Sequence, residues 1–212
     1  MLNIKNICYI VGAGEMNQKF APTENDMVIA ADGGYNHLKK AGIKPDIIIG
    51  DFDSLQEKPT GDNVVSFPVM KDDTDTMLAI KAGLEKGFKS FVIYGGMGGR
   101  LDHTLANVQA LSYIANRGGR GYLLSENENI TVIKNSNLKF DKSSRGYISV
   151  FSVGGIATGV YLDGLMYPLN NATVTTDFPI GVSNKFTGKE ATVTVKDGML
   201  AVMWYGDIKN IL

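Results

Sequence analysis

Residues 91–114 read FVIYGGMGGRLDHTLANVQALSYI, and this stretch decides the fold class of the protein. It begins with the apolar run Phe91–Tyr94, which favours a strand buried on both faces. A glycine-rich turn follows at residues 95–99. Apolar side chains then recur at the spacing of one face of an α-helix: Leu101, Leu105, Val108, Leu111 and Ile114. Strand, turn and helix in this order are the building unit of a parallel α/β sheet.

The same unit recurs through the first half of the chain. Met77, Ile80 and Leu84 indicate a second amphipathic helix, which Gly87 is expected to end. Further apolar runs predict the other strands of the sheet: Ile7–Val11, Met27–Ala31, Ile47–Ile49, Val64–Phe67 and Tyr122–Leu124. We therefore predict a doubly wound, mostly parallel α/β domain over residues 1–126.

The second half of the chain has a different pattern, without a sustained helical period. Short strand-like segments follow one another: Ile130–Ile133, Tyr147–Val153, Gly159–Leu162, Ala172–Thr176, Ala191–Val195 and Met199–Trp204. Lys196-Asp197-Gly198 predicts a hairpin between the last two, because Asp-Gly favours turns that match the twist of paired strands. Many short strands separated by turns are typical of a β-sandwich, which we predict for residues 127–212.

Composition excludes several classes of protein. Of the 212 residues, 44 % are hydrophobic and 20 % are charged, as in an ordinary globular protein. The formal net charge of −1 provides no basic footprint for a nucleic acid. The single cysteine, Cys8, excludes an internal disulfide, and the apolar runs are too short for a membrane span. We expect a cytoplasmic protein that binds neither nucleic acid nor membrane.

Acidic residues follow four of the predicted strands, and the carboxyl ends of parallel strands meet at one edge of a sheet. Clustered carboxylates repel one another unless a cation neutralises them, and oxygen ligands suit Mg²⁺ or Mn²⁺. The residues concerned are Asp32, Asp51, Asp53, Asp72, Asp73, Asp75 and Asp102. For Asp75 and Asp102 the alternative is an ordinary helix N-cap. The clustering favours a metal site over separate caps.

The glycine-rich turn at residues 95–99 adds an anion-binding signature, because backbone N–H groups can approach a phosphate where side chains are absent. Arg100 follows with a guanidinium suited to phosphate oxygens. Next to acidic metal ligands, the ligand expected here is a nucleotide polyphosphate. The chain has no Walker A motif, and Gly12-Ala13-Gly14 does not complete a dinucleotide fingerprint, although it is a candidate turn near phosphate.

Together these motifs resemble the thiamine pyrophosphokinase family in order and spacing. They are Ala31-Asp32-Gly33-Gly34, Gly50-Asp51-Phe52-Asp53-Ser54, Asp72-x-Thr74-Asp75 and Gly95-Gly96-x-x-Gly99-Arg100-x-Asp102-His103, with Gly164–Leu169 and Val182-Ser183-Asn184 in the second half. The resemblance implies a thiamine diphosphokinase that transfers pyrophosphate from ATP to the hydroxyethyl oxygen of thiamine, giving thiamine diphosphate and AMP. It also implies Mg²⁺ and a homodimer whose active site lies between subunits.

The resemblance assigns roles to individual residues of the first half. Asp51, Asp53 and Asp75 would hold Mg²⁺ and the ATP phosphates, and Arg100 would stabilise phosphate charge. Other residues implied in ATP binding are Asp32, Lys71, Asp72, Thr74, Gly96 and Gly99. For Lys71, a solvated loop position is the alternative. The carboxylate that accepts the hydroxyl proton stays open between Asp102 and Asp53, and His103 is expected to orient Asp102 or cap the helix.

In the second half, the resemblance implies a thiamine site. Tyr167 matches an aromatic stacking position, and Leu169, Ser183 and Asn184 match positions near the substrate. The alternatives are an ordinary tyrosine at a strand end and an ordinary turn.

Two functions of other classes stay open beside this one. Asp51-x-Asp53 also fits the metal-binding pair of some glycosyltransferases, although that interpretation leaves Arg100 unexplained. A nucleotide sensor without catalytic activity would bind ATP but release no AMP when thiamine is added.

Overall fold

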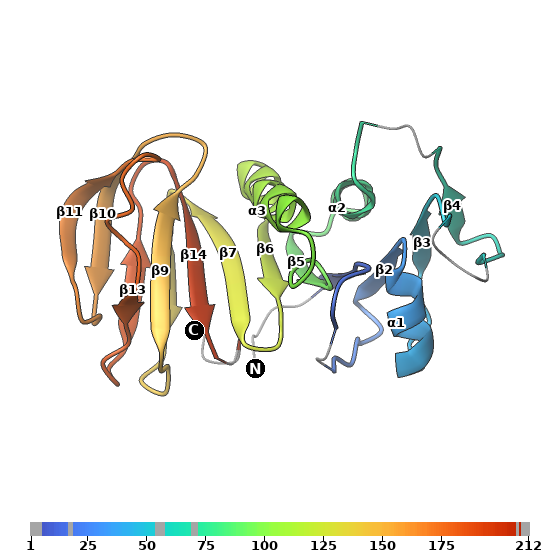
Figure 1. The fold of residues 1–212 in the computed structure, drawn as a ribbon, viewed down its shortest axis with the longest axis horizontal. Coiled ribbons are helices and arrows are strands. Elements are labelled where there is room, and N and C mark those ends of the chain that lie inside the picture. Colours follow the sequence, from blue (N-terminus) through green and yellow to red (C-terminus); the bar gives the residue numbers. More distant parts are fainter. Residues whose placement is uncertain (1–5, 17–18, 54–57, 69–71, 207, 209–212) are drawn as a thin grey trace. The chain divides into compact units, whose positions relative to one another are not determined.

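The computed structural model describes residues 6–16, 19–53, 58–68, 72–206 and 208. The chain divides into two compact units, shown in Figure 1. The N-terminal unit comprises residues 4–110 with 121–126, and the C-terminal unit comprises residues 111–120 with 127–212. The fold is mixed α/β, with parallel strands in the first unit and antiparallel strands in the second.

The N-terminal unit is built on a parallel sheet whose strands lie in the order β6-β5-β1-β2-β3-β4. The strands are β1 Ile7–Val11, β2 Met27–Ala31, β3 Ile47–Gly50, β4 Val64–Ser66, β5 Ser90–Tyr94 and β6 Arg120–Leu124. The helices are α1 Gly34–Ala41, α2 Asp75–Glu85 and α3 Leu101–Asn116. All six predicted strands of this half are therefore confirmed to within two residues at each end, as is the βαβ alternation.

The apolar stripe predicted for α3 is buried over only part of its length. Leu111 and Ile114 are fully buried, whereas Leu101 is 72 % exposed and Leu105 is 58 % exposed. The predicted stripe is confirmed as one side of a helix, but its first two members are exposed. Helical periodicity reveals which side of a helix is apolar, but not what covers that side.

The C-terminal unit contains two four-stranded groups, in the orders β12-β9-β14-β7 and β11-β10-β13-β8. The strands are β7 Glu128–Lys134, β8 Asn137–Phe140, β9 Tyr147–Ser152, β10 Ala157–Asp163, β11 Leu169–Val174, β12 Asn184–Lys185, β13 Ala191–Thr194 and β14 Met199–Tyr205. Strands β8 and β12 were not predicted, because each is short and lacks an apolar run. Phe140 of β8 packs edge-on against Trp204 of β14, with ring centroids 5.5 Å apart, so side chains from the two groups share a core.

The predicted hairpin at Asp197-Gly198 is wrong. Strand β13 pairs with β8 and β10, whereas β14 pairs with β7 and β9, so this segment connects the two groups of strands. Gly198 does have the positive φ, +102°, that a tight turn uses. The dipeptide therefore indicates the local backbone conformation correctly, but the partners of the flanking strands are chosen by their buried faces.

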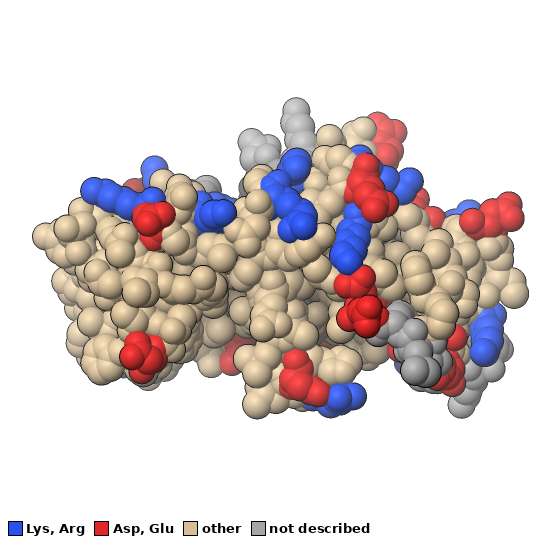
Figure 2. All heavy atoms as spheres, turned by 90° about the horizontal axis from the view of Figure 1, so that it is seen from above, with Lys and Arg blue, Asp and Glu red and all other residues tan. Residues whose placement is uncertain are grey.

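Charged side chains of both signs are interspersed over the face shown in Figure 2, and neither sign covers that face. Among the residues that the structure describes, no helix combines the length and the apolar character needed to cross a membrane.

Candidate active site

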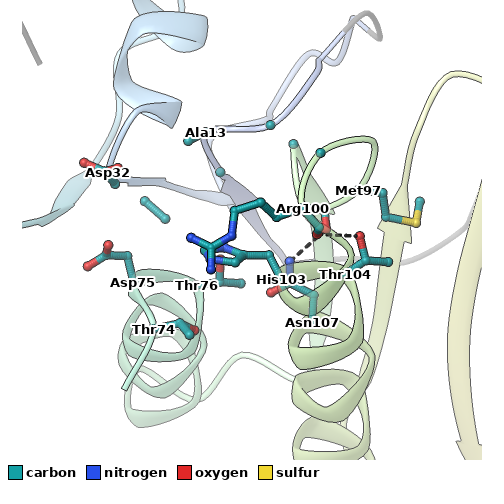
Figure 3. Close-up of a pocket in the computed structure, with 16 residues that line it drawn as sticks. Ala13, Asp32, Thr74, Asp75, Thr76, Met97, Arg100, His103, Thr104 and Asn107 are labelled. Carbon is teal, nitrogen blue, oxygen red and sulfur yellow. Dashed lines mark hydrogen bonds between the residues drawn. The ribbon is translucent and has the colours of Figure 1, made fainter. Parts of the chain in front are cut away.

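A cavity of about 380 Å³ opens in the N-terminal unit where β1, β2 and β5 end, the edge at which the sequence predicts ligand binding. Figure 3 shows Asp32 and Asp75 on one side of it and Arg100 and His103 on the other. The lining residues are Gly12, Ala13, Gly14, Ala31, Asp32, Thr74, Asp75, Thr76, Gly95, Gly96, Met97, Gly99, Arg100, His103, Thr104 and Asn107.

The wall of the cavity nearest β1 and β5 is made of backbone. The N–H groups of Gly12 and Gly14 donate to the carbonyl oxygens of Tyr94 and Gly95, at 2.8 and 2.9 Å. A Cβ atom on either glycine would lie within 2.8 Å of the Gly95 carbonyl oxygen, which real side chains do not tolerate. The segment following β1, a candidate phosphate turn from sequence, thus lines the cavity because only glycine allows this close approach.

The wall at the end of β2 carries a strained acidic residue. Asp32 has φ +46°, in the left-handed region, and its N–H donates to the Ile49 carbonyl at 2.7 Å. A Cβ atom on Gly34 would overlap the Val11 carbonyl oxygen, so the following helix can begin against β1 only with glycine there. The Asp-Gly-Gly motif therefore brings the start of α1 against the end of β1 and leaves the carboxylate of Asp32 at the cavity.

The start of α2 contributes Thr74 and Asp75. Thr74 is the N-cap, and its side-chain oxygen accepts from the Met77 N–H at 3.2 Å. The N-cap alternative for Asp75 is therefore wrong: Asp75 is the first helical residue, and it lines the cavity. The neighbouring Asp73 forms an ion pair with Lys81 at 2.6 Å, which ties this segment to the second turn of its own helix.

Arg100 and Asp102 form an ion pair at the start of α3. The guanidinium donates to both carboxylate oxygens, with distances of 3.2 Å from Nε and 2.6 Å from Nη2. This pairing lowers the pKa of Asp102 below its ordinary value, helped by a hydrogen bond from the His103 N–H. Asp102 lies inside the helix, not at its N-cap, and only Arg100 of the pair lines the cavity. The Asp102 carboxylate therefore orients the Arg100 guanidinium without itself lining the cavity.

Asp51 and Asp53 follow β3 as a mutually repelling pair. Their side chains share a hydrogen bond, which raises the pKa of Asp53, with further contributions from desolvation and from the charges of Asp51 and Asp32. Between them, Phe52 has φ +58° and is buried, which keeps the two carboxylates outside the core. Repulsion between two neighbouring carboxylates is reduced when a cation binds between them, which agrees with the predicted metal site.

Not every predicted ATP or metal residue reaches the cavity. Gly96 and Gly99 line it, whereas Asp51, Asp53 and Asp72 do not. Lys71 lies outside the described residues. Over the part of the chain that the structure describes, no three His, Cys, Asp or Glu side chains are arranged to hold a metal ion. The assignment of Asp51, Asp53 and Asp75 to one ion therefore stays a prediction.

The predicted thiamine residues belong to the C-terminal unit. Tyr167 is 60 % exposed, in the segment preceding β11. The Asn184 side chain is buried: its oxygen accepts from the N–H groups of Tyr167 and Lys185, at 3.0 and 2.8 Å, and its nitrogen donates to the Tyr167 carbonyl at 2.6 Å. Asn184 thus fixes the backbone of Tyr167, whereas the neighbouring Ser183 is exposed, with φ +59°, and Leu169 is half-buried.

Sequence reasoning missed several residues of the cavity. Asn107 is the most buried polar one, and Thr76 and Thr104 also line the wall. A signal for part of this set was available, because Arg100, Thr104 and Asn107 recur at spacings of four and three along α3. This polar row lies at the start of α3, next to the glycine-rich turn.

An α/β unit with a glycine-lined cavity at the carboxyl edge of its sheet belongs to the general class of phosphate-binding enzymes. Comparison with known proteins identifies the family. Residues 21–123 match the model described as "Thiamin pyrophosphokinase, catalytic domain", and residues 135–200 match "Thiamin pyrophosphokinase, vitamin B1 binding domain". The chain therefore belongs to the thiamin pyrophosphokinase family, a family of enzymes.

Individual relatives agree with this family. Thiamine pyrophosphokinase from Bacillus subtilis is 29 % identical over 187 residues, covering 85 % of this chain and 87 % of the relative. The crystal structure of thiamine pyrophosphokinase from the same organism has a TM-score of 0.83 and 28 % identity, and covers 96 % of this chain and 100 % of its own. That from Geobacillus thermodenitrificans has a TM-score of 0.79 and 26 % identity, with 96 % and 99 % coverage.

Proposed function

We propose that this protein is a Mg²⁺-dependent thiamine pyrophosphokinase, which transfers the pyrophosphoryl group of ATP to the hydroxyethyl oxygen of thiamine. The observation that carries the proposal is the cavity itself. The glycine-rich backbone of residues 95–99 and the Arg100 guanidinium form one side of it, and the carboxylates of Asp32 and Asp75 face them. A polyphosphate with a bound cation complements both sides.

The ATP phosphates lie along residues 95–99 in this proposal, with Arg100 paired to the transferred group. Asp51, Asp53 and Asp75 would hold Mg²⁺, since the first two are close enough for the Asp51 carboxylate to raise the pKa of Asp53. Bound there, the ion neutralises phosphate charge. Asp32 and Thr74 border the same space, and the Thr74 hydroxyl keeps its hydrogen free to donate while its oxygen caps α2.

In the reaction, the hydroxyethyl oxygen of thiamine attacks the β-phosphorus of ATP. The new oxygen–phosphorus bond forms as the bond from the β-phosphorus to the α,β-bridging oxygen breaks, so AMP leaves with that oxygen. The hydroxyl proton passes to a carboxylate. The acceptor stays open between Asp102, whose carboxylate is paired with Arg100, and Asp53, whose carboxylate is assigned here to Mg²⁺. Asp102 also orients Arg100 through this pair.

Thiamine binds, in this proposal, to the C-terminal domain through Tyr167, with Leu169 and Ser183 near it, and Asn184 supports Tyr167 from behind. A homodimer with its active site between subunits is supported by apolar side chains exposed on both units. They include Leu101, Leu105, Tyr167, Phe178, Ile180 and Val182. We accordingly propose a doubly wound catalytic domain at residues 1–126 and a β-sandwich domain for thiamine binding and dimerisation at residues 127–212, in a cytoplasmic enzyme.

The test is direct. The purified protein is incubated with ATP, Mg²⁺ and thiamine, and AMP and thiamine diphosphate are followed by chromatography. Equal amounts of both products, dependent on Mg²⁺, are expected. ATP binding without AMP release would favour a nucleotide sensor, and turnover of a UDP-sugar in place of ATP would favour a glycosyltransferase.

A further inference from the structure

Asn107 is a buried polar residue of α3 that borders the nucleotide cavity. Asn107 is only 6 % exposed, and its Nδ2 donates to the carbonyl oxygen of Gly96 at 2.8 Å. The contact is closely fitted, because a Cβ atom on Gly96 would lie 3.0 Å from Nδ2 and 2.5 Å from a methyl group of Leu123. A buried amide in this position is stable only while its hydrogen bond is made.

The segment that Asn107 holds also accepts a hydrogen bond at Gly95, from the Gly14 N–H at 2.9 Å, but its glycines give it little rigidity of its own. Gly95 and Gly98 have φ values of +64° and +85°, and a chain with four glycines in five residues loses much conformational entropy when ordered. Asn107 adds a hydrogen bond from a side chain to this segment, at the Gly96 carbonyl. The shape of this cavity wall therefore depends on a residue more than one helical turn beyond Arg100.

We infer that Asn107 is a positioning residue for the nucleotide phosphates: it holds the backbone of residues 95–99 in the form that receives them. The inference rests on the proposed function only in taking this cavity to be the nucleotide site. Asn107 does not act on the reacting atoms. Its loss is expected to weaken ATP binding more than it slows the chemical step, because the glycine segment must then be ordered by the ligand.

The first variant is Asn107→Leu, which keeps the number and branching of the side-chain heavy atoms but cannot donate. We expect the KM for ATP, and the Kd for Mg²⁺–ATP from calorimetry, to rise about tenfold, with kcat within about threefold of the wild-type value. Asn116→Leu is the matched control, since Asn116 is exposed on the same helix and bonds only Lys134 at 2.8 Å among the described residues. It should leave the Kd unchanged.

The second variant, Asn107→Asp, separates positioning from simple structural support. An ionised carboxylate cannot donate to the Gly96 carbonyl, whereas a protonated one can. Burial raises the pKa of such a carboxyl group, so the ratio of its Kd to that of the wild type should fall as the pH falls from 8 to 6. The ratio for Asn107→Leu should stay flat. The other ionisable side chains that line the cavity are the same in every variant, so each ratio compares proteins that differ at residue 107 alone; they are Asp32, Asp75, Arg100 and His103.

Two results would overturn the inference: a folded Asn107→Leu protein with wild-type Kd, or a folded Asn107→Asp protein whose Kd ratio does not change with pH. If Asn107→Leu fails to fold by circular dichroism, the Asp variant alone decides. Because the Kd for Mg²⁺–ATP is measured without thiamine, the result stands even if the wild type forms no thiamine diphosphate. That second failure would count against the proposed reaction and not against the role of Asn107.

Discussion

Replacing Asp53 by Asn is expected to abolish most of the activity without loss of stability. In the folded protein the Asp53 carboxylate is exposed, shares a hydrogen bond with Asp51 and is repelled by the charges of Asp51 and Asp32, and these contacts raise its pKa. A raised pKa means that ionised Asp53 is less favourable in the folded than in the unfolded chain, so at pH 7 its neutralisation removes repulsion. We expect the Tm of Asp53→Asn to equal or exceed that of the wild type.

The activity should change in the opposite direction. Loss of one carboxylate at a metal and phosphate site typically removes about 3 kcal/mol of transition-state stabilisation, which is a fall in kcat/KM of about 10²-fold. Added Mg²⁺–ATP should raise the Tm of the wild type but not that of the variant. Asp62→Asn, which removes the same charge from an exposed turn of the same unit, is the control. Near-wild-type turnover of both Asp51→Asn and Asp53→Asn at limiting Mg²⁺ would refute the metal assignment.

Three further predictions concern the two proposed substrate sites. Arg100→Lys should lose about 10- to 10³-fold in kcat/KM, because an ammonium group cannot reproduce two parallel donors to phosphate oxygens, and equal activity would make Arg100 a structural cation. Asn184→Ala should raise the KM for thiamine while the KM for ATP stays constant, and equal rises in both would show that Asn184 does not act on thiamine alone. Asp53→Ala and Tyr167→Ala, each inactive, should restore about a quarter of wild-type activity when co-expressed, since half the dimers are mixed and each has one intact site. Absence of recovery in mixed dimers confirmed by mass spectrometry would place both residues in a single-chain site.

The edge of the sheet that carries the cavity could be predicted from the sequence, and local reasons explain why. Most strands of the N-terminal unit contain a run of consecutive apolar residues, which marks where each strand lies in the sequence. Parallel pairing then brings their carboxyl ends together whatever the details of packing, which places Asp32, Asp75 and Arg100 around one space. These residues follow from chain order and strand direction alone.

Features that depend on long-range packing could not be predicted in this way. Nothing in the residues around Asp197-Gly198 indicates that β13 and β14 belong to different groups of strands. Nor does the sequence reveal that the side-chain amide of Asn184 forms hydrogen bonds with the backbone of Tyr167, seventeen residues away. The role of Asn107 could not be predicted for the same reason, because its partner Gly96 is eleven residues distant.

Backbone strain offers an independent indication of where this chain has been shaped for binding. Six non-glycine residues of the described chain have positive φ, and four of them are Asn or Asp, which adopt the left-handed region readily. The other two are Phe52 and Ser183. Phe52 separates the two carboxylates expected to hold Mg²⁺, and Ser183 precedes the asparagine that supports Tyr167. Such conformations cost about 1–3 kcal/mol each and persist where the surrounding structure enforces them, commonly at functional sites. Phe52 and Ser183, the two residues least suited to a positive φ, thus belong to the motifs that we assign to Mg²⁺–ATP and to thiamine. Those motifs were assigned from sequence, without reference to φ values.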